Sequence, residues 1–132
     1  MTNQSYIEHF LNRFSSFFDA VVRELQVVYR QNNQTVIVSL MLSARDVETP
    51  ENDGWVDVLL RIEGVTEFRF ADSQKASYQV LSDGLKILPI REGLFFDLGF
   101  FDELPSDFDE LALSQHYAFG TGFTWEVRTY AD

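Results

Sequence analysis

The chain has 132 residues, of which 45% are hydrophobic and 15% aromatic, and its formal net charge is −11 at pH 7. This length and composition can fill one hydrophobic core, so they indicate a single folded domain over residues 1–132 and exclude a disordered chain. The absence of cysteine excludes disulfides, thiolate metal sites and cysteine nucleophiles, and the negative charge excludes nucleic acid and anionic membranes as expected partners.

The first predicted element is a helix that starts at Ser5. Ser5 and Glu8 have the spacing of a capping box, and apolar residues recur at the helical period through Phe14. The same rhythm can be extended to residue 32 as one long helix. Residues 20–30 instead favour a strand, because their β-branched and aromatic side chains alternate on two faces. We therefore predict a helix followed by a strand.

The rest of the chain is predicted to be β-rich. Residues 72–83 fit either a short strand or a helical turn. The strand that contains Pro89 is expected at a sheet edge, because proline has no backbone N–H to donate. The predicted fold class is α+β, with an N-terminal helix and a mainly antiparallel sheet of seven or eight strands, in one layer or two. The further strands expected are 35–45, paired with 20–30 as a hairpin, then 55–63, 65–70, 85–90, 94–100 and 120–130.

No pattern in the sequence indicates an enzyme, a cofactor or a metal site. Ser114 and His116 could share one face of a strand, but a catalytic triad needs a geometry that the spacing does not supply. Residues 51–57 contain oxygen ligands in a partial calcium-loop pattern, yet the loop motif and its bidentate acid are missing. We therefore expect a protein that is not an enzyme, with no cofactor, no metal and no catalytic residues.

Residues 92–111, EGLFFDLGFFDELPSDFDEL, combine phenylalanines and acidic residues without any Lys or Arg. In one interpretation Leu94, Phe96 and Leu98 belong to a core strand and Phe108 is a plug that holds its loop down. In the other, Phe101 and Phe108 are aromatic anchors in an acidic binding patch, because interface hot spots favour aromatics with a polar rim. The candidate binding residues are Phe101, Asp102, Glu103, Asp107, Phe108, Asp109 and Glu110.

Four segments resemble a loose family of small bacterial β-rich proteins, some of which are immunity proteins of polymorphic toxin systems. The segments are FFDAVVRELQVVYR, TVIVSLML, VDVLLRIEGVTEFRF and LFFDLG, between residues 17 and 98. Gly64-Val65 matches a family Gly-Val, whereas Phe18 stands where the family has histidine. The resemblance implies a β-rich fold and a role as an immunity protein.

The leading hypothesis is a non-enzymatic protein-binding domain, similar to an immunity protein that neutralises a cationic toxin through its acidic-aromatic surface. The expected partner is a basic protein, with no nucleic acid and no membrane, and the oligomeric state is left open. The sequence shows neither a signal peptide nor a membrane span, so we expect a cytoplasmic location. The alternative is a small-molecule-binding β-rich domain whose aromatic pocket is lined by Trp55, Phe68, Tyr78 and Trp125.

Overall fold

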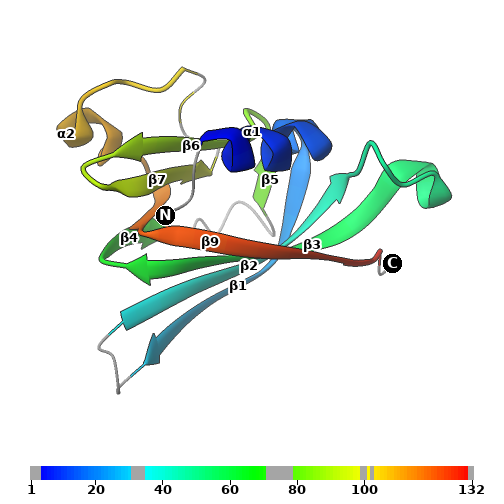
Figure 1. Cartoon of the computed structure of the whole chain (residues 1–132), viewed down its shortest axis with the longest axis horizontal. Coiled ribbons are helices and arrows are strands. Elements are labelled where there is room, and N and C mark those ends of the chain that lie inside the picture. The colour runs from blue at the N-terminus through cyan, green and yellow to red at the C-terminus, as the bar shows by residue number, and fades with distance from the viewer. Residues whose placement is uncertain (1–3, 31–34, 71–78, 99–100, 102, 131–132) are drawn as a thin grey trace.

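The computed structural model describes residues 4–30, 35–70, 79–98, 101 and 103–130, and it contains an N-terminal helix and two antiparallel sheets (Figure 1). The helical elements are α1 (Gln4–Arg13), η1 (Ser15–Phe17), η2 (Glu51–Gly54) and α2 (Phe108–Leu111). The strands are β1 (Ala20–Arg30), β2 (Thr35–Arg45), β3 (Trp55–Val65), β4 (Glu67–Phe70), β5 (Gln79–Leu81), β6 (Leu85–Ile90), β7 (Gly93–Leu98), β8 (His116–Gly120) and β9 (Gly122–Thr129).

The predicted helix and mainly antiparallel architecture are confirmed, and the strands form two sheets. The five-stranded sheet has the order β5-β1-β2-β3-β9, and the four-stranded sheet has the order β4-β8-β7-β6, which places Pro89 on an edge strand. Over the described residues there are nine strands, not seven or eight. The strand that no expected range covered is β8 (His116–Gly120), whereas β5 falls within residues 72–83, which fitted either a short strand or a helical turn.

Residues 20–30 form a strand because the helix before them is stopped. Ser15, Ser16 and Phe17 all have positive φ angles, between 54° and 58°, and a left-handed turn cannot continue a right-handed helix. Phe17 is fully buried, which offsets the strain of the turn. The structure also corrects the predicted helix start: α1 begins at Gln4, so Ser5 lies inside the helix and does not cap it.

The inner face of the five-stranded sheet carries the main hydrophobic core. Phe10 of α1 packs against this face, with its ring centroid 5.0 Å from that of Phe123 in β9. Phe96 of β7 meets the same Phe123 ring edge-on at 5.6 Å. Helix α1 and the four-stranded sheet therefore cover one face of the larger sheet together (Figure 1). The buried hydrophobic residues that β2 and β3 contribute are Val38, Leu40, Leu42, Ala44, Val56, Val58, Leu60, Ile62 and Val65.

Two neighbouring chain segments pass from one sheet to the other at the same place. β3 pairs with β9 in the five-stranded sheet, and after Thr66 the chain continues as β4 in the four-stranded sheet. β8 makes the reverse passage through Thr121 into β9. The N–H of Thr66 donates to the carbonyl of Phe119 at 3.0 Å, and the N–H of Thr121 donates to the carbonyl of Glu63 at 2.9 Å. We call this junction the sheet corner.

Glycine is required on both segments of the sheet corner. Gly64 has a φ of +61°, and a Cβ atom there would collide with the side chain of Thr121. At Gly120, a Cβ atom would lie 2.5 Å from the carbonyl oxygen of Glu63. The two segments can therefore bend together only because neither of these positions has a side chain.

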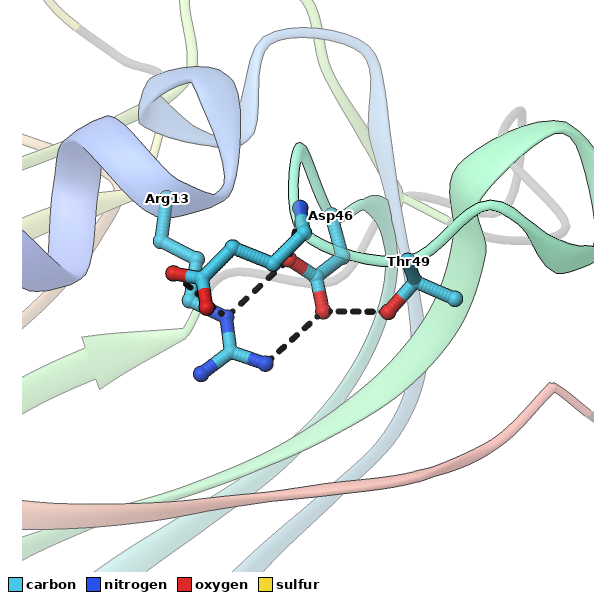
Figure 2. A network of polar contacts seen from close by, with 4 residues as sticks. Arg13, Asp46 and Thr49 are labelled. Carbon is cyan, nitrogen blue, oxygen red and sulfur yellow. Dashed lines mark hydrogen bonds and ion pairs between the residues drawn. The ribbon is translucent and has the colours of Figure 1, made fainter.

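A partly buried ion pair fastens α1 to the connection between β2 and β3 (Figure 2). The Nε and Nη2 atoms of Arg13 each lie 3.0 Å from one carboxylate oxygen of Asp46, which is 2% exposed. The hydroxyl of Thr49 donates to the same carboxylate at 2.6 Å, and the backbone N–H of Glu48 donates at 2.9 Å. Burial by itself would raise the pKa of Asp46, but these donors and the charge of Arg13 outweigh it and lower the pKa to about 2.

We predict that Gly64→Ala destabilises the fold by about 1–3 kcal/mol, because alanine at positive φ is strained and its methyl group meets Thr121. Urea unfolding followed by circular dichroism measures the change. A second substitution, Thr121→Ala, should recover part of the lost stability. It removes the hydroxyl and methyl groups that the new methyl group at position 64 would meet, so that only the backbone strain remains. Equal losses in the single and double variants would contradict the steric part of this account.

We predict that Asp46 contributes about 2 kcal/mol to stability at neutral pH, from the lowering of its pKa from 3.8 to about 2. A lowered pKa means that the contribution is complete above pH 3.8 and is lost as the pH falls through about 2. The difference in unfolding free energy between the wild type and Asp46→Asn should therefore be constant from neutral pH to about pH 4 and shrink below it. Glu51→Gln, in an exposed side chain, is the matched control and should show no comparable difference.

Candidate functional site: the acidic surface around α2

A second, smaller hydrophobic cluster lies on the face of the four-stranded sheet that points away from the main core. Phe95 and Tyr117 stack on this face with ring centroids 5.1 Å apart. Phe108 of α2 stands edge-on to Phe95 at 6.0 Å and to Phe119 at 5.1 Å. Strand β7 is therefore buried on both faces, and the aromatic ring of Phe108 holds α2 against the sheet.

Buried polar contacts fix the chain on both sides of α2. Asp97 is fully buried in β7, and its carboxylate accepts hydrogen bonds from the Phe101 N–H at 3.0 Å and the Ser114 hydroxyl at 2.8 Å. Lys86 of β6 donates to the carbonyls of Phe101 and Asp83, each at 2.7 Å. Since Phe101 precedes α2 and Ser114 follows it, Asp97 anchors both ends of the segment that carries α2.

The outward side of this segment is acidic. We define the α2 acidic surface as Glu103, Asp107, Asp109 and Glu110, all of which are exposed. None of these four side chains forms an ion pair with another residue in the described part of the chain. Asp107 caps α2 by accepting from the N–H of Asp109. The guanidinium of Arg91, 4.2 Å from the ring centroid of Phe108, is a cation at the border of this surface.

The structure places the predicted binding residues in different environments. Phe108 is 8% exposed and fills the second cluster, so it occupies the position of the inward plug. Phe101 is half-buried against the same cluster, and Asp102 lies outside the described residues. The remaining four predicted residues make up the α2 acidic surface, and their role in binding stays a prediction. Asp97, from the same acidic stretch, is a buried anchor that the sequence pattern did not reveal.

Ser114 and His116 lie close together, but the hydrogen bonds between them use the backbone of His116. The N–H of His116 donates to the Ser114 oxygen at 3.1 Å, and that hydroxyl has one proton, which goes to Asp97 at the shorter distance of 2.8 Å. Ser114 is fully buried. Its hydroxyl therefore ties two strands and the α2 segment together, which is a structural role.

The aromatic residues suggested for a ligand pocket do not converge. Trp125 packs under α1 on the inner face of the five-stranded sheet, whereas the ring of Trp55 lies tilted beside that of Tyr130, with centroids 6.1 Å apart, on the outer face. Phe68 stacks on Phe70 in β4, and Tyr78 lies outside the described residues. Within the described residues, no three His, Asp or Glu side chains gather in a way that could hold a metal ion.

A polar network on the outer face of the five-stranded sheet was not predicted. Ser43 and Asp57 lie on neighbouring strands, are buried, and are joined by a 2.6 Å hydrogen bond from the serine hydroxyl to the carboxylate. Arg23 donates to Ser43 at 2.7 Å and to the hydroxyl of Tyr130 at 2.9 Å. Asp57 is only 7% exposed, although it alternates along β3 with the core residues Val56 and Val58.

We predict that Phe108→Ala lowers the free energy of unfolding by about 3–5 kcal/mol, because it removes a buried ring from the second cluster. Leu113→Ala is the matched control, since Leu113 lies two residues after the end of α2 and is 62% exposed, and it should change stability by less than about 0.5 kcal/mol. Urea denaturation of both variants measures the two values. Equal effects at the two positions would contradict the inward packing of Phe108.

Comparison of the chain with protein-family models, with curated proteins and with solved structures finds no match in any of the three. No helix in the described part of the chain is long and apolar enough to cross a membrane.

Proposed function

We propose that the chain is a non-enzymatic protein-binding domain that captures a basic protein through the α2 acidic surface. The observation that supports this most directly is the combination of exposed carboxylates, free of ion pairs among the described residues, with a rigid support beneath them. The support is the buried ring of Phe108 together with the anchors at Asp97 and Lys86.

A fixed acidic surface favours fast and specific capture of a cationic partner. Clustered negative charges raise the local concentration of positively charged partners and accelerate their encounter. An ordered segment also loses little conformational entropy on binding. Exposed apolar area next to the charges would then supply contact energy. Leu113 provides such area at the end of α2, in place of the buried Phe108.

The partner chemistry that fits this surface is a protein with a cluster of Lys and Arg at its own functional site. A cationic toxin that acts on nucleic acid has such a cluster, because it must neutralise phosphates. The resemblance to immunity proteins leads to the same class of partner. In this proposal, the chain neutralises the toxin by covering its basic surface.

The test uses the immobilised chain to capture proteins from an extract of its native cells at low and high salt, about 50 and 500 mM, because screening weakens contacts between exposed charges. We expect one basic protein to be retained at low salt. Its association rate should fall about tenfold or more with the double variant Asp109→Lys/Glu110→Lys. Asp107 is left unchanged, since it caps α2.

The matched control is Glu8→Lys/Glu51→Lys, which makes the same change in net charge with exposed residues of α1 and η2. This control should retain an association rate close to that of the wild type. An identical slowing in both double variants would show that only net charge matters, and no slowing in either would remove the α2 acidic surface as the site of capture.

A further inference from the structure

Strand β1 has an edge that the described strands leave unpaired over most of its length. β5 pairs with it only from Ala20 to Val22, and the register with β2 shifts between Val22 and Glu24. From Glu24 to Arg30, no strand of the described chain pairs with β1 on the side away from β2. Figure 1 shows this part of the β1–β2 hairpin extending away from both helices and from the four-stranded sheet. Backbone groups along such an edge are available to another strand.

Exposed apolar side chains are concentrated on this edge. Tyr29 is 69% exposed, and Leu25 and Val28 are each 40% exposed. Monomeric proteins usually protect edge strands by charge, proline, bulges or a covering element, because a flat apolar edge pairs with other strands. The free part of β1 has charges only at its two ends, Glu24 and Arg30.

We propose that residues 24–30 of β1 pair antiparallel with the same residues of a second copy of this chain, on a twofold axis at Val27. In this register Glu24 lies opposite Arg30 of the second copy, which gives one ion pair at each end of the interface. Leu25 lies opposite Tyr29 on the inner face of the sheet, and Gln26 lies opposite Val28 on the outer face. The two five-stranded sheets would then form one continuous sheet.

The charges of residues 24–30 favour this register over registers shifted by two residues and over parallel pairing. A shift of two residues places Glu24 opposite Val28 or Arg30 opposite Gln26, so the charges lose their partners. Parallel pairing would bring identical charges together, which is unfavourable for directly opposed residues. The antiparallel register around Val27 pairs all seven residues and both charges, as an isologous twofold interface requires.

The charge of the segment also favours association of two copies here. Each copy has a net charge of −11, so most surfaces repel one another. Residues 23–30, RELQVVYR, contain two arginines and one glutamate and are locally positive. Two copies can therefore approach along this edge without bringing their acidic surfaces together, and this inference does not depend on the proposed function of α2.

The test uses two exposed charge reversals, Glu24→Arg and Arg30→Glu. Each variant alone places like charges at both ends of the interface and should be monomeric, whereas an equimolar mixture restores both ion pairs and should form a heterodimer. Sedimentation velocity and light scattering, over about 1 µM to 1 mM, cover the dissociation constants of weak interfaces. The wild type should dimerise, with a dissociation constant about tenfold or more below that of either variant.

Glu8→Arg, an exposed reversal on α1, is the matched control and should dimerise like the wild type. Circular dichroism checks that each variant is folded. If the mixed variants form a heterodimer, both are folded, and the loss of the dimer in each single variant is due to the interface. A wild type that is monomeric throughout this range overturns the proposal, as does a dimer that persists in both single variants or fails to return when they are mixed.

Discussion

The sheet corner is the constraint on which the rest of the structure depends. β3 and β8 leave their sheets side by side, and Gly64 and Gly120 allow their backbones to approach where any side chain would collide. Because one segment continues into β4 and the other into β9, the corner orients the four-stranded sheet over the same face of the larger sheet that α1 covers. The main core, the second cluster and the position of α2 all follow from this orientation.

Buried carboxylates fasten the chain at three further places, and each joins segments that are distant in sequence. Asp46 joins α1 to the β2–β3 connection through Arg13, Asp97 anchors the α2 segment through Ser114, and Asp57 bonds to Ser43 across two strands. A buried carboxylate is tolerated only where donors surround it, so these contacts also specify the arrangement of the segments. Within the acidic stretch 92–111, Asp97 is buried in this way, whereas the residues of the α2 acidic surface are exposed.

The two surfaces proposed for association are distinct. The α2 acidic surface is rigid and charged and suits fast encounter with a cationic protein, whereas the β1 edge is apolar with a charge at each end and suits pairing of backbone groups. They are carried by different sheets, α2 by the four-stranded sheet and β1 by the five-stranded one. Self-association through β1 could therefore present two α2 acidic surfaces in one assembly, which would raise the effective affinity for a partner with repeated basic sites.

The sequence by itself determined the regular elements that have one buried face. The alternation in residues 20–30 and 55–63 and the helical period around Phe10 reflect burial that repeats with the geometry of the element, so a local pattern is enough to predict them.

Only the tertiary structure decided which acidic residues are buried, because Asp46 depends on a donor 33 residues away and Asp97 on one 17 residues away. The same holds for Phe108, whose loop has no periodicity and whose ring turns inward because β7 and β8 leave an aromatic surface for it to cover. The edge of β1 that the described strands leave unpaired likewise follows from the order of strands in the sheet, which no local pattern specifies.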